Sequence, residues 1–145
     1  MIRLERVVDA LPAGFDALRI EASATGHSML DRLAAEWSGG AMRFDRPDER
    51  LLAAYVDDAL AGIGGLTREP AIAGALRMRR FYVALAYRRA GVGRALAGTL
   101  LRHVTARTIT CNAAAGSEVF WERLGFNPDR RQGYTHIAVI TAASG

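Results

Sequence analysis

A turn rich in glycine and arginine, Arg88-Arg89-Ala90-Gly91-Val92-Gly93-Arg94, constrains the fold of this chain more than any other segment. It follows the run 76–83, which we predict to be a strand, and it leads into a predicted helix whose apolar residues recur at a spacing of four: Val92, Leu96, Leu100 and Val104. The segment 108–112 is predicted to be a second strand. A strand, a helix of about a dozen residues and another strand form a βαβ unit with parallel strands. The turn therefore lies where such a unit passes from strand to helix.

Arginines are concentrated around this turn. The stretch between Pro70 and Ser117 has no acidic residue and holds eight arginines, namely Arg77, Arg79, Arg80, Arg88, Arg89, Arg94, Arg102 and Arg107. The remaining eleven arginines are outnumbered by fifteen acidic residues, so the positive charge is local. A glycine-rich turn at a helix N-terminus offers free backbone N–H groups and the positive end of the helix dipole. Together these features predict a site for a ligand that carries phosphate.

Composition limits the other classes of protein. A chain of 145 residues, half of them hydrophobic, is the size of one domain and can bury a core of its own. Cys111 is the only cysteine, which excludes an internal disulfide and a cysteine-rich metal site. The absence of lysine excludes the lysine of a Walker-type phosphate loop and lysine Schiff-base chemistry. No apolar run suits a signal peptide or a membrane span, so we expect a soluble cytoplasmic protein.

Local patterns predict the remaining elements. The predicted strands are 2–8, the hairpin 51–56 and 60–67 around Asp57-Asp58, and 134–141. Two helices are expected before Gly39, one after Pro12 and one behind Ser28 as N-cap, and a short helix is expected over 117–124 with Gly125 after its end. The pair Gly64-Gly65 indicates either an irregular strand or a close approach of another group.

Three patterns of residues along the chain together resemble the GCN5-related N-acetyltransferase (GNAT) family. The first is Val83 followed by Arg88-Arg89-Ala90-Gly91-Val92-Gly93, which is similar to the family's strand-to-helix signature. The second is Asn112 with the later segment Ser117-Glu118-Val119-Phe120-Trp121-Glu122-Arg123-Leu124-Gly125-Phe126, and the third is the hairpin around Asp57-Asp58. The resemblance implies a single α+β domain over 1–145, a mixed α/β structure of three layers. Its sheet would be mostly antiparallel, with helices on both faces and two parallel strands that splay apart.

The resemblance also implies a co-substrate and its site. Acetyl-CoA would bind between the splayed strands, with its pyrophosphate on the backbone of 89–94, and no metal would take part. The backbone of Phe81 and Val83 would pair with the pantetheine arm, and the Val83 N–H would polarise the thioester carbonyl. The residues expected to bind acetyl-CoA are Phe81, Val83, Arg88, Arg89, Gly91, Val92, Gly93, Arg94, Asn112, Phe120 and Trp121. Asn112 could instead cap the short helix or hold the splayed strand.

The residues that would act as general acid and general base are less well defined than those that would bind acetyl-CoA. Many family members have a tyrosine acid at the position of Trp121, and an indole N–H cannot take that role at neutral pH. Trp121 would then be a wall of the site or part of the core. Tyr134 is the preferred substitute over Cys111, Ser117 or water, with an ordinary half-buried tyrosine as the alternative. Glu69 is a candidate base, with a solvated loop residue as the alternative, and His27 lies in the expected acceptor region.

The acceptor is expected to be a small-molecule or peptide amine, beneath the loop between the first two helices and the segment 37–44. Arg77, Arg79 and Arg80 form either a solvated strand face or a site for a carboxylate or phosphate on the acceptor. A homodimer is a conceivable assembly, and neither nucleic acid nor a membrane is an expected partner. Two alternatives stay open: an acetyl-CoA sensor without turnover, and an arginine-rich nucleic-acid-binding module in which Tyr82 and Tyr87 stack on bases.

Overall fold

The computed structural model describes residues 1–104, 107–130 and 133–140, and these fold around one mixed sheet. The order across the sheet is β1-β2-β3-β4-β5-β7-β6. The strands are β1 (Ile2–Arg6), β2 (Arg50–Val56), β3 (Ala59–Arg68), β4 (Leu76–Val83), β5 (Arg107–Cys111), β6 (Asn127–Pro128) and β7 (His136–Ile140). Neighbouring strands in the described part of the sheet are antiparallel except β4 and β5, which are parallel as predicted.

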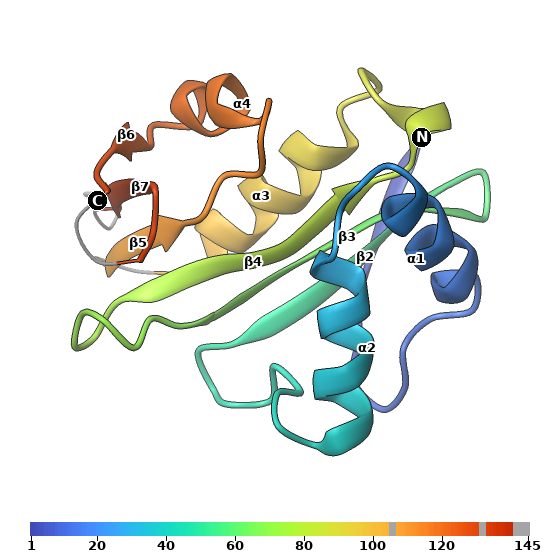
Figure 1. The fold of residues 1–145 in the computed structure, drawn as a ribbon, viewed down its shortest axis with the longest axis horizontal. Helices are drawn as coiled ribbons and strands as arrows, with labels where there is room; N and C mark the ends of the chain where they lie inside the picture. Colours follow the sequence, from blue (N-terminus) through green and yellow to red (C-terminus); the bar gives the residue numbers. More distant parts are fainter. Residues whose placement is uncertain (105–106, 131–132, 141–145) are drawn as a thin grey trace.

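Helices cover both faces of the sheet and make three layers (Figure 1). One face carries α1 (Phe15–Ala24) and α2 (Met29–Gly39), which bury Phe15, Leu33 and other apolar residues against β2 and β3. The other face carries α3 (Val92–His103) and α4 (Glu118–Arg123), whose Leu96 and Trp121 belong to a second apolar cluster. A short 3₁₀ helix, η1 (Leu85–Tyr87), joins β4 to the glycine-arginine turn. The predicted α+β architecture is confirmed.

The predicted elements agree with the structure within a few residues. Ser28 is the N-cap residue of α2, although its side chain makes no capping hydrogen bond, and Gly125 follows the end of α4 with a φ of 101°. The prediction missed the two-residue strand β6. It also began the last strand at Tyr134, whereas β7 begins at His136. The end predicted for that strand, residue 141, lies outside the described residues.

Strand β4 contains a bulge opposite the paired glycines of β3. Ile63 pairs with Tyr82 and Gly65 with Arg79, so β4 has one more residue than β3 over this interval, and Arg80 has a φ of 61°. A Cβ on Gly64 would lie 2.7 Å from the Phe81 ring, and one on Gly65 would lie 2.5 Å from the Phe44 ring. Both explanations of the paired glycines therefore apply: the strand is irregular, and aromatic rings approach it closely.

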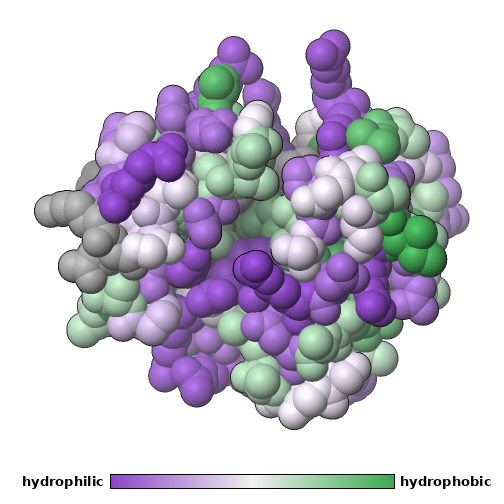
Figure 2. All heavy atoms as spheres, viewed as in Figure 1, coloured by the Kyte–Doolittle hydropathy of each residue, from purple (hydrophilic) through white to green (hydrophobic). Residues whose placement is uncertain are grey.

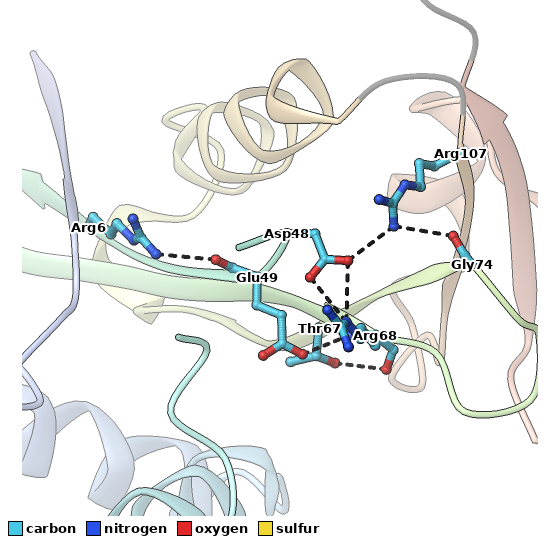
Figure 3. A network of polar contacts seen from close by, with 7 residues as sticks. All are labelled: Arg6, Asp48, Glu49, Thr67, Arg68, Gly74 and Arg107. Atoms are coloured by element: carbon cyan, nitrogen blue, oxygen red, sulfur yellow. Dashed lines mark hydrogen bonds and ion pairs between the residues drawn. The ribbon is translucent and has the colours of Figure 1, made fainter. Parts of the chain in front are cut away.

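A polar network fixes the first residue of β5 (Figure 3). Asp48 accepts hydrogen bonds from Arg68 on β3 and from Arg107 on β5, each at 3.2 Å. Arg107 also donates to the Gly74 carbonyl at 3.3 Å, and Glu49 accepts from the Arg68 N–H at 3.0 Å. Arg6 on β1 donates to the Glu49 carbonyl at 3.4 Å, so the network joins the loop before β2 to the three strands β1, β3 and β5. It therefore anchors the start of β5 beside the start of β4, and the pairing of the two strands continues to Cys111, the last residue of β5.

Candidate active site

Strands β4 and β5 separate halfway along β4 and leave a cleft. The described pairing runs from Leu76 to Met78 on β4, whereas β4 itself continues to Val83. The cleft beside this separation has a volume of about 1070 Å³. It is bounded by the loop between α1 and α2, by β4, by the glycine-arginine turn with the start of α3, and by the segment from Cys111 to Trp121. Figure 2 shows a hollow near the middle of this face, with hydrophilic residues gathered along its lower side.

The charged side chains that line the cleft are all positive. Among the described lining residues there is no aspartate or glutamate, and the charged ones are Arg32, Arg77, Arg79, Arg80, Arg88, Arg89 and Arg94. His27, in the loop between α1 and α2, also lines the cleft. A cavity with charges of one sign raises the local concentration of oppositely charged ligands. The cleft is therefore suited to a polyanion.

The backbone of β4 faces the cleft with unused hydrogen-bonding groups. The Ala84 N–H donates to the Ala61 carbonyl at 2.8 Å, and the next pair along the two strands is Gly62 with Val83. Because backbone groups alternate between the two edges of an antiparallel strand, the Val83 N–H points away from β3 and toward β5. The Phe81 N–H, two residues earlier, points the same way. Both amides lie beyond Met78, where the pairing with β5 has ended, so an extended ligand can pair with them.

The glycine-arginine turn leaves further backbone amides free. Arg89 and Gly91 both have a left-handed backbone, with φ of 68° and 85°. The first bond of α3 runs from the Ala95 N–H to the Gly91 carbonyl at 2.9 Å. The three preceding amides, of Val92, Gly93 and Arg94, have no partner within the helix, since the first turn of any helix lacks acceptors. Alternating backbone conformations at a helix N-terminus form the kind of concave amide cluster that binds phosphate.

Aromatic packing explains the second glycine of the turn. A Cβ on Gly93 would lie 3.2 Å from the Phe120 ring on α4, so the backbone of α3 and this ring are in close contact. Arg88 is also held in place, because its Nε donates to the Val83 carbonyl at 3.1 Å and its guanidinium lies over the Tyr82 ring. Arg89 and Arg94 are exposed at the cleft, and in the described structure neither forms an ion pair.

Trp121 is both a wall of the cleft and part of the core. Its ring is buried and makes edge contacts with Phe81, Phe120 and Phe126, with centroids 5.0 to 5.4 Å apart. Trp121 and Phe120 line the cleft, as does the exposed Asn112 at the end of β5. The two alternatives considered for Trp121 are therefore both realised.

The arginines of β4 are not a solvated strand face, and that interpretation is wrong. Arg80 donates to both carboxylate oxygens of Glu36 on α2, at 3.0 and 2.9 Å, and its side chain is only 11% exposed. Arg77 lies 3.6 Å from the Glu69 carboxylate and donates to the Gly133 carbonyl. The bulge is the physical reason, because Arg79 and Arg80 follow each other on the face that α2 covers. The residues on either side, Met78 and Phe81, pack on the α3 side.

The suggested acid and base residues differ in their placement. Glu69 is buried rather than solvated, because it accepts hydrogen bonds from the Thr110 hydroxyl at 2.7 Å and from the Ala71 N–H at 3.0 Å. Glu69 and the buried Tyr134 are not among the residues that line the cleft. Cys111 and Ser117 do line it. Burial raises the pKa of the Cys111 thiol to about 12, against the opposing effect of Arg77, and the Ser117 hydroxyl donates to the Ala114 carbonyl at 2.7 Å.

Two carboxylates beside the cleft were not predicted. Glu21 on α1 accepts a 2.6 Å hydrogen bond from the Tyr82 hydroxyl and a 3.0 Å bond from the Leu85 N–H. The Tyr82 hydrogen bond lowers the pKa of Glu21, while burial raises the pKa of Tyr82. The second is Glu36, the partner of Arg80. The partners are 61 and 44 positions apart in the sequence, so no local pattern could have identified them.

Of the two segments predicted to cover the acceptor, one lines the cleft and the other does not. The loop between α1 and α2 lines the cleft from Thr25 to Met29. The segment 37–44 does not, since Trp37 and Phe44 are buried in the apolar cluster beneath α1 and α2. The described residues contain no group of three or more His, Cys, Asp or Glu side chains that could hold a metal ion. No helix within the described ranges is long and apolar enough to span a membrane.

Comparison with known proteins gives one family and many similar folds. Residues 21–140 match the sequence model of the acetyltransferase (GNAT) domain. A candidate acetyltransferase from Exiguobacterium sp. 255-15 has a TM-score of 0.87 at 21% identity, over 96% of this chain and 93% of that one. An N-acetyltransferase from Bacillus subtilis in complex with coenzyme A has a TM-score of 0.61 at 17% identity, over 94% and 95%. A search of curated proteins found no significant match.

Proposed function

Because the chain belongs to the GNAT acetyltransferase family, we propose that it transfers an acetyl group from acetyl-CoA directly to an amine acceptor. The observation that carries the proposal is the free edge of β4, which leads through η1 into the N-terminal turn of α3. One continuous track thus offers strand amides to an extended arm and helix amides to phosphate groups. In the net reaction an amine nitrogen gains the acetyl carbon, the carbon–sulfur bond breaks, and the amine proton leaves.

The residues of the turn fit the phosphates of acetyl-CoA. The amides of Val92, Gly93 and Arg94 would bind the pyrophosphate, and Arg89 and Arg94 would add fixed positive charge. Each hydrogen bond to a charged oxygen contributes about 1.5–3 kcal/mol, so several suffice to hold the co-substrate without a metal. Arg88 would act through the Val83 carbonyl that it binds, by fixing the turn against the end of β4. When bound, acetyl-CoA supplies the acetyl group as an activated thioester.

Strand amides and aromatic walls would hold the rest of the co-substrate. The Val83 and Phe81 N–H groups would pair with the pantetheine arm, and the Val83 N–H would polarise the thioester carbonyl. Phe120 and Trp121 would exclude water from the opposite side, and Asn112 is placed to bond an amide of the arm. Trp121 would therefore form a wall of the cleft and would not act as the general acid.

Proton transfer would involve His27 and water. Among the described residues that line the cleft, His27 is the one side chain of a type that commonly accepts a proton near neutral pH. We propose it as the group that takes the proton of the acceptor amine. The Cys111 thiol is too weak an acid to protonate the leaving thiolate, because its pKa is raised to about 12. A thiolate is a good leaving group, and water can supply its proton.

The alternative functions are weaker. In a nucleic-acid-binding module the rings of Tyr82 and Tyr87 would stack on bases, but Tyr82 is buried and its hydroxyl is bound to Glu21. A sensor would bind acetyl-CoA by the same contacts as the enzyme and differ only in the absence of turnover. An experiment must therefore measure binding and turnover separately.

Thermal-shift titration with acetyl-CoA, CoA and an oligonucleotide, followed by thiol release with a panel of amines, separates the three functions. The enzyme is expected to be stabilised by acetyl-CoA and to release thiol only when a suitable amine is present. Stabilisation without thiol release from any amine would favour the sensor. Stabilisation by the oligonucleotide alone, lost steeply with added salt, would reject the enzyme.

The variant Gly91→Glu tests the phosphate site. It places a carboxylate at the turn and should abolish the shift by acetyl-CoA. Gly91 has a left-handed φ of 85°, so any side chain also strains the backbone there. Gly74→Glu is the matched control, because Gly74 has a similar φ of 78° in open space and does not line the cleft. Unchanged acetyl-CoA affinity in Gly91→Glu would place the phosphates elsewhere.

A further inference from the structure

Arg79 is a partly buried cation whose charge is not matched by a carboxylate. Its Nε donates to the neutral Thr67 hydroxyl at 2.9 Å, and in the described part of the chain it forms no ion pair. Burial, and then the neighbouring Arg77 and Arg80, lower the pKa of its guanidinium. Taking a charge out of water without a partner costs free energy. The protein therefore carries a cost at this position that a bound anion would relieve.

The neighbouring carboxylates are already engaged. Glu36 binds Arg80 through both oxygens. Glu69 accepts from Thr110 and Ala71 and lies near Arg77. Apart from the three arginines near the turn, the lining arginines left without an acidic partner among the described residues are Arg79 and Arg32. The cleft thus keeps an excess of positive charge beside α2, apart from the three arginines near the turn.

The two unmatched arginines face the same part of the cleft. Arg32 is four residues before Glu36 on α2, so it lies one helical turn away on the same side of that helix. Glu36 binds Arg80, the immediate neighbour of Arg79. Arg79 is four residues before Val83, which corresponds to roughly 10–13 Å along a strand, on the side away from the phosphate-binding turn. An anion at Arg79 would therefore be distinct from the phosphates held at residues 89–94.

We propose that the acceptor is an amine that also carries an anionic group, a carboxylate or a phosphate, and that Arg79 binds this group with the help of Arg32. The inference rests on the proposed acetyl transfer and adds the chemical class of the acceptor. Within the described residues the planar guanidinium of Arg79 uses only its Nε, so its terminal N–H groups can bind two oxygens of one anion. The anion would hold the acceptor so that its amino group reaches the part of the cleft beside Phe81.

The first test measures anion binding without turnover. The protein is saturated with CoA, which fills the phosphate-binding turn, and its melting temperature is compared in phosphate, acetate and chloride at constant ionic strength. We expect phosphate or acetate to raise the melting temperature of the wild type and to have no such effect on Arg79→Gln. Arg102→Gln is the matched control, because Arg102 is exposed on α3 and, in the part of the chain that the structure describes, bonds only to Thr99 of its own helix. An equal anion effect in Arg79→Gln, or none in the wild type, would overturn the inference.

The second test compares amines in matched pairs. Amino acids are set against their carboxamides, and phosphoethanolamine against ethanolamine, with kcat/KM from thiol release. We expect the anionic member of at least one pair to be preferred by about tenfold or more, the usual worth of one charge-assisted hydrogen bond, and Arg79→Gln to remove the preference. The pair that shows it identifies the anion as carboxylate or phosphate.

The outcomes separate this inference from the proposed function. Equal acetylation of neutral and anionic amines would overturn the inference and leave acetyl transfer intact. Absence of any stabilisation by acetyl-CoA would overturn the proposed function itself. If no amine of the panel is acetylated, the melting temperatures of the CoA-saturated protein alone decide whether Arg79 binds an anion.

Discussion

The cleft contains two groups of arginines that differ in exposure and in their partners. Arg88, Arg89 and Arg94, the turn arginines, are exposed around the N-terminus of α3 and have no carboxylate partner among the described residues. Arg77, Arg79 and Arg80, the strand arginines, are partly buried, and two of them have acidic partners from other elements. At the turn, the backbone supplies the binding groups and arginine adds charge. On the strand, the same residue type also holds the sheet to α2. Position therefore decides whether an arginine serves the ligand, the fold or both.

The largest effect on stability should come from breaking the contact between β4 and α2. Glu36→Gln leaves the Arg80 guanidinium, with a side chain only 11% exposed, without its charged partner, and should cost about 2–3 kcal/mol. Urea unfolding measures it. Asp31→Asn is the matched control, since Asp31 pairs with Arg19 between side chains 44% and 45% exposed, and solvent-exposed ion pairs contribute little to stability. Similar losses in the two variants would contradict a structural role for the strand arginines.

A smaller loss of stability, with a larger loss of binding, is expected at the turn. Gly93→Val places side-chain atoms against the Phe120 ring, which a Cβ alone would approach to 3.2 Å. Such overpacking costs about 1–3 kcal/mol, and displacement of Phe120 should weaken acetyl-CoA binding at least tenfold in calorimetric titration. Gly98→Val on the same helix is the control, because its Cβ would meet only the flexible end of Arg102. Equal acetyl-CoA affinity in both variants would show that the turn tolerates bulk.

The pH dependence of stability tests whether burial or the charge of the strand arginine Arg77 has the larger effect on the pKa of Cys111. Burial raises the pKa of Cys111 to about 12 in the folded state, although Arg77 opposes this. The unfolded chain therefore loses the thiol proton first as pH rises, and stability is lost from about pH 9 upward, by about 1–2 kcal/mol at pH 10. Cys111→Ala should remove this part of the alkaline loss, as measured by urea unfolding at pH 8 and pH 10. An unchanged pH slope would show that the thiol ionises readily and that the charge of Arg77 outweighs burial.

The smallest effect is expected at the unmatched strand arginine. Arg79→Gln removes a charge that has no acidic partner among the described residues and lies beside two like charges, so stability should change by no more than about 0.5 kcal/mol. Glutamine can still donate to the Thr67 hydroxyl. Chemical unfolding of the ligand-free protein provides the measurement. A loss close to that of Glu36→Gln would mean that Arg79 is a structural residue rather than one available to a ligand.

Features set by neighbouring residues were predictable from the sequence, and features set by distant partners were not. The spacing from Val92 to Val104 predicted α3, and the glycine-arginine turn predicted the passage from strand to helix, because both signals lie within a few positions. The solvated environment predicted for Glu69 was wrong because Thr110, which binds its carboxylate, is 41 positions away. The bulge in β4 depends on register with β3, so alternation along β4 alone could not reveal that Arg79 and Arg80 share a face.

The absence of carboxylates from the described lining of the cleft has a consequence for the rate of the reaction. A positive cleft speeds the capture of a negatively charged co-substrate from solution, and added salt slows that capture. Loss of the acetyl group leaves every phosphate of CoA in place, so the arginines would retain the product as firmly as the co-substrate. Salt would then act in two opposed directions, with slower capture and faster product release. Turnover should therefore pass through a maximum as ionic strength rises.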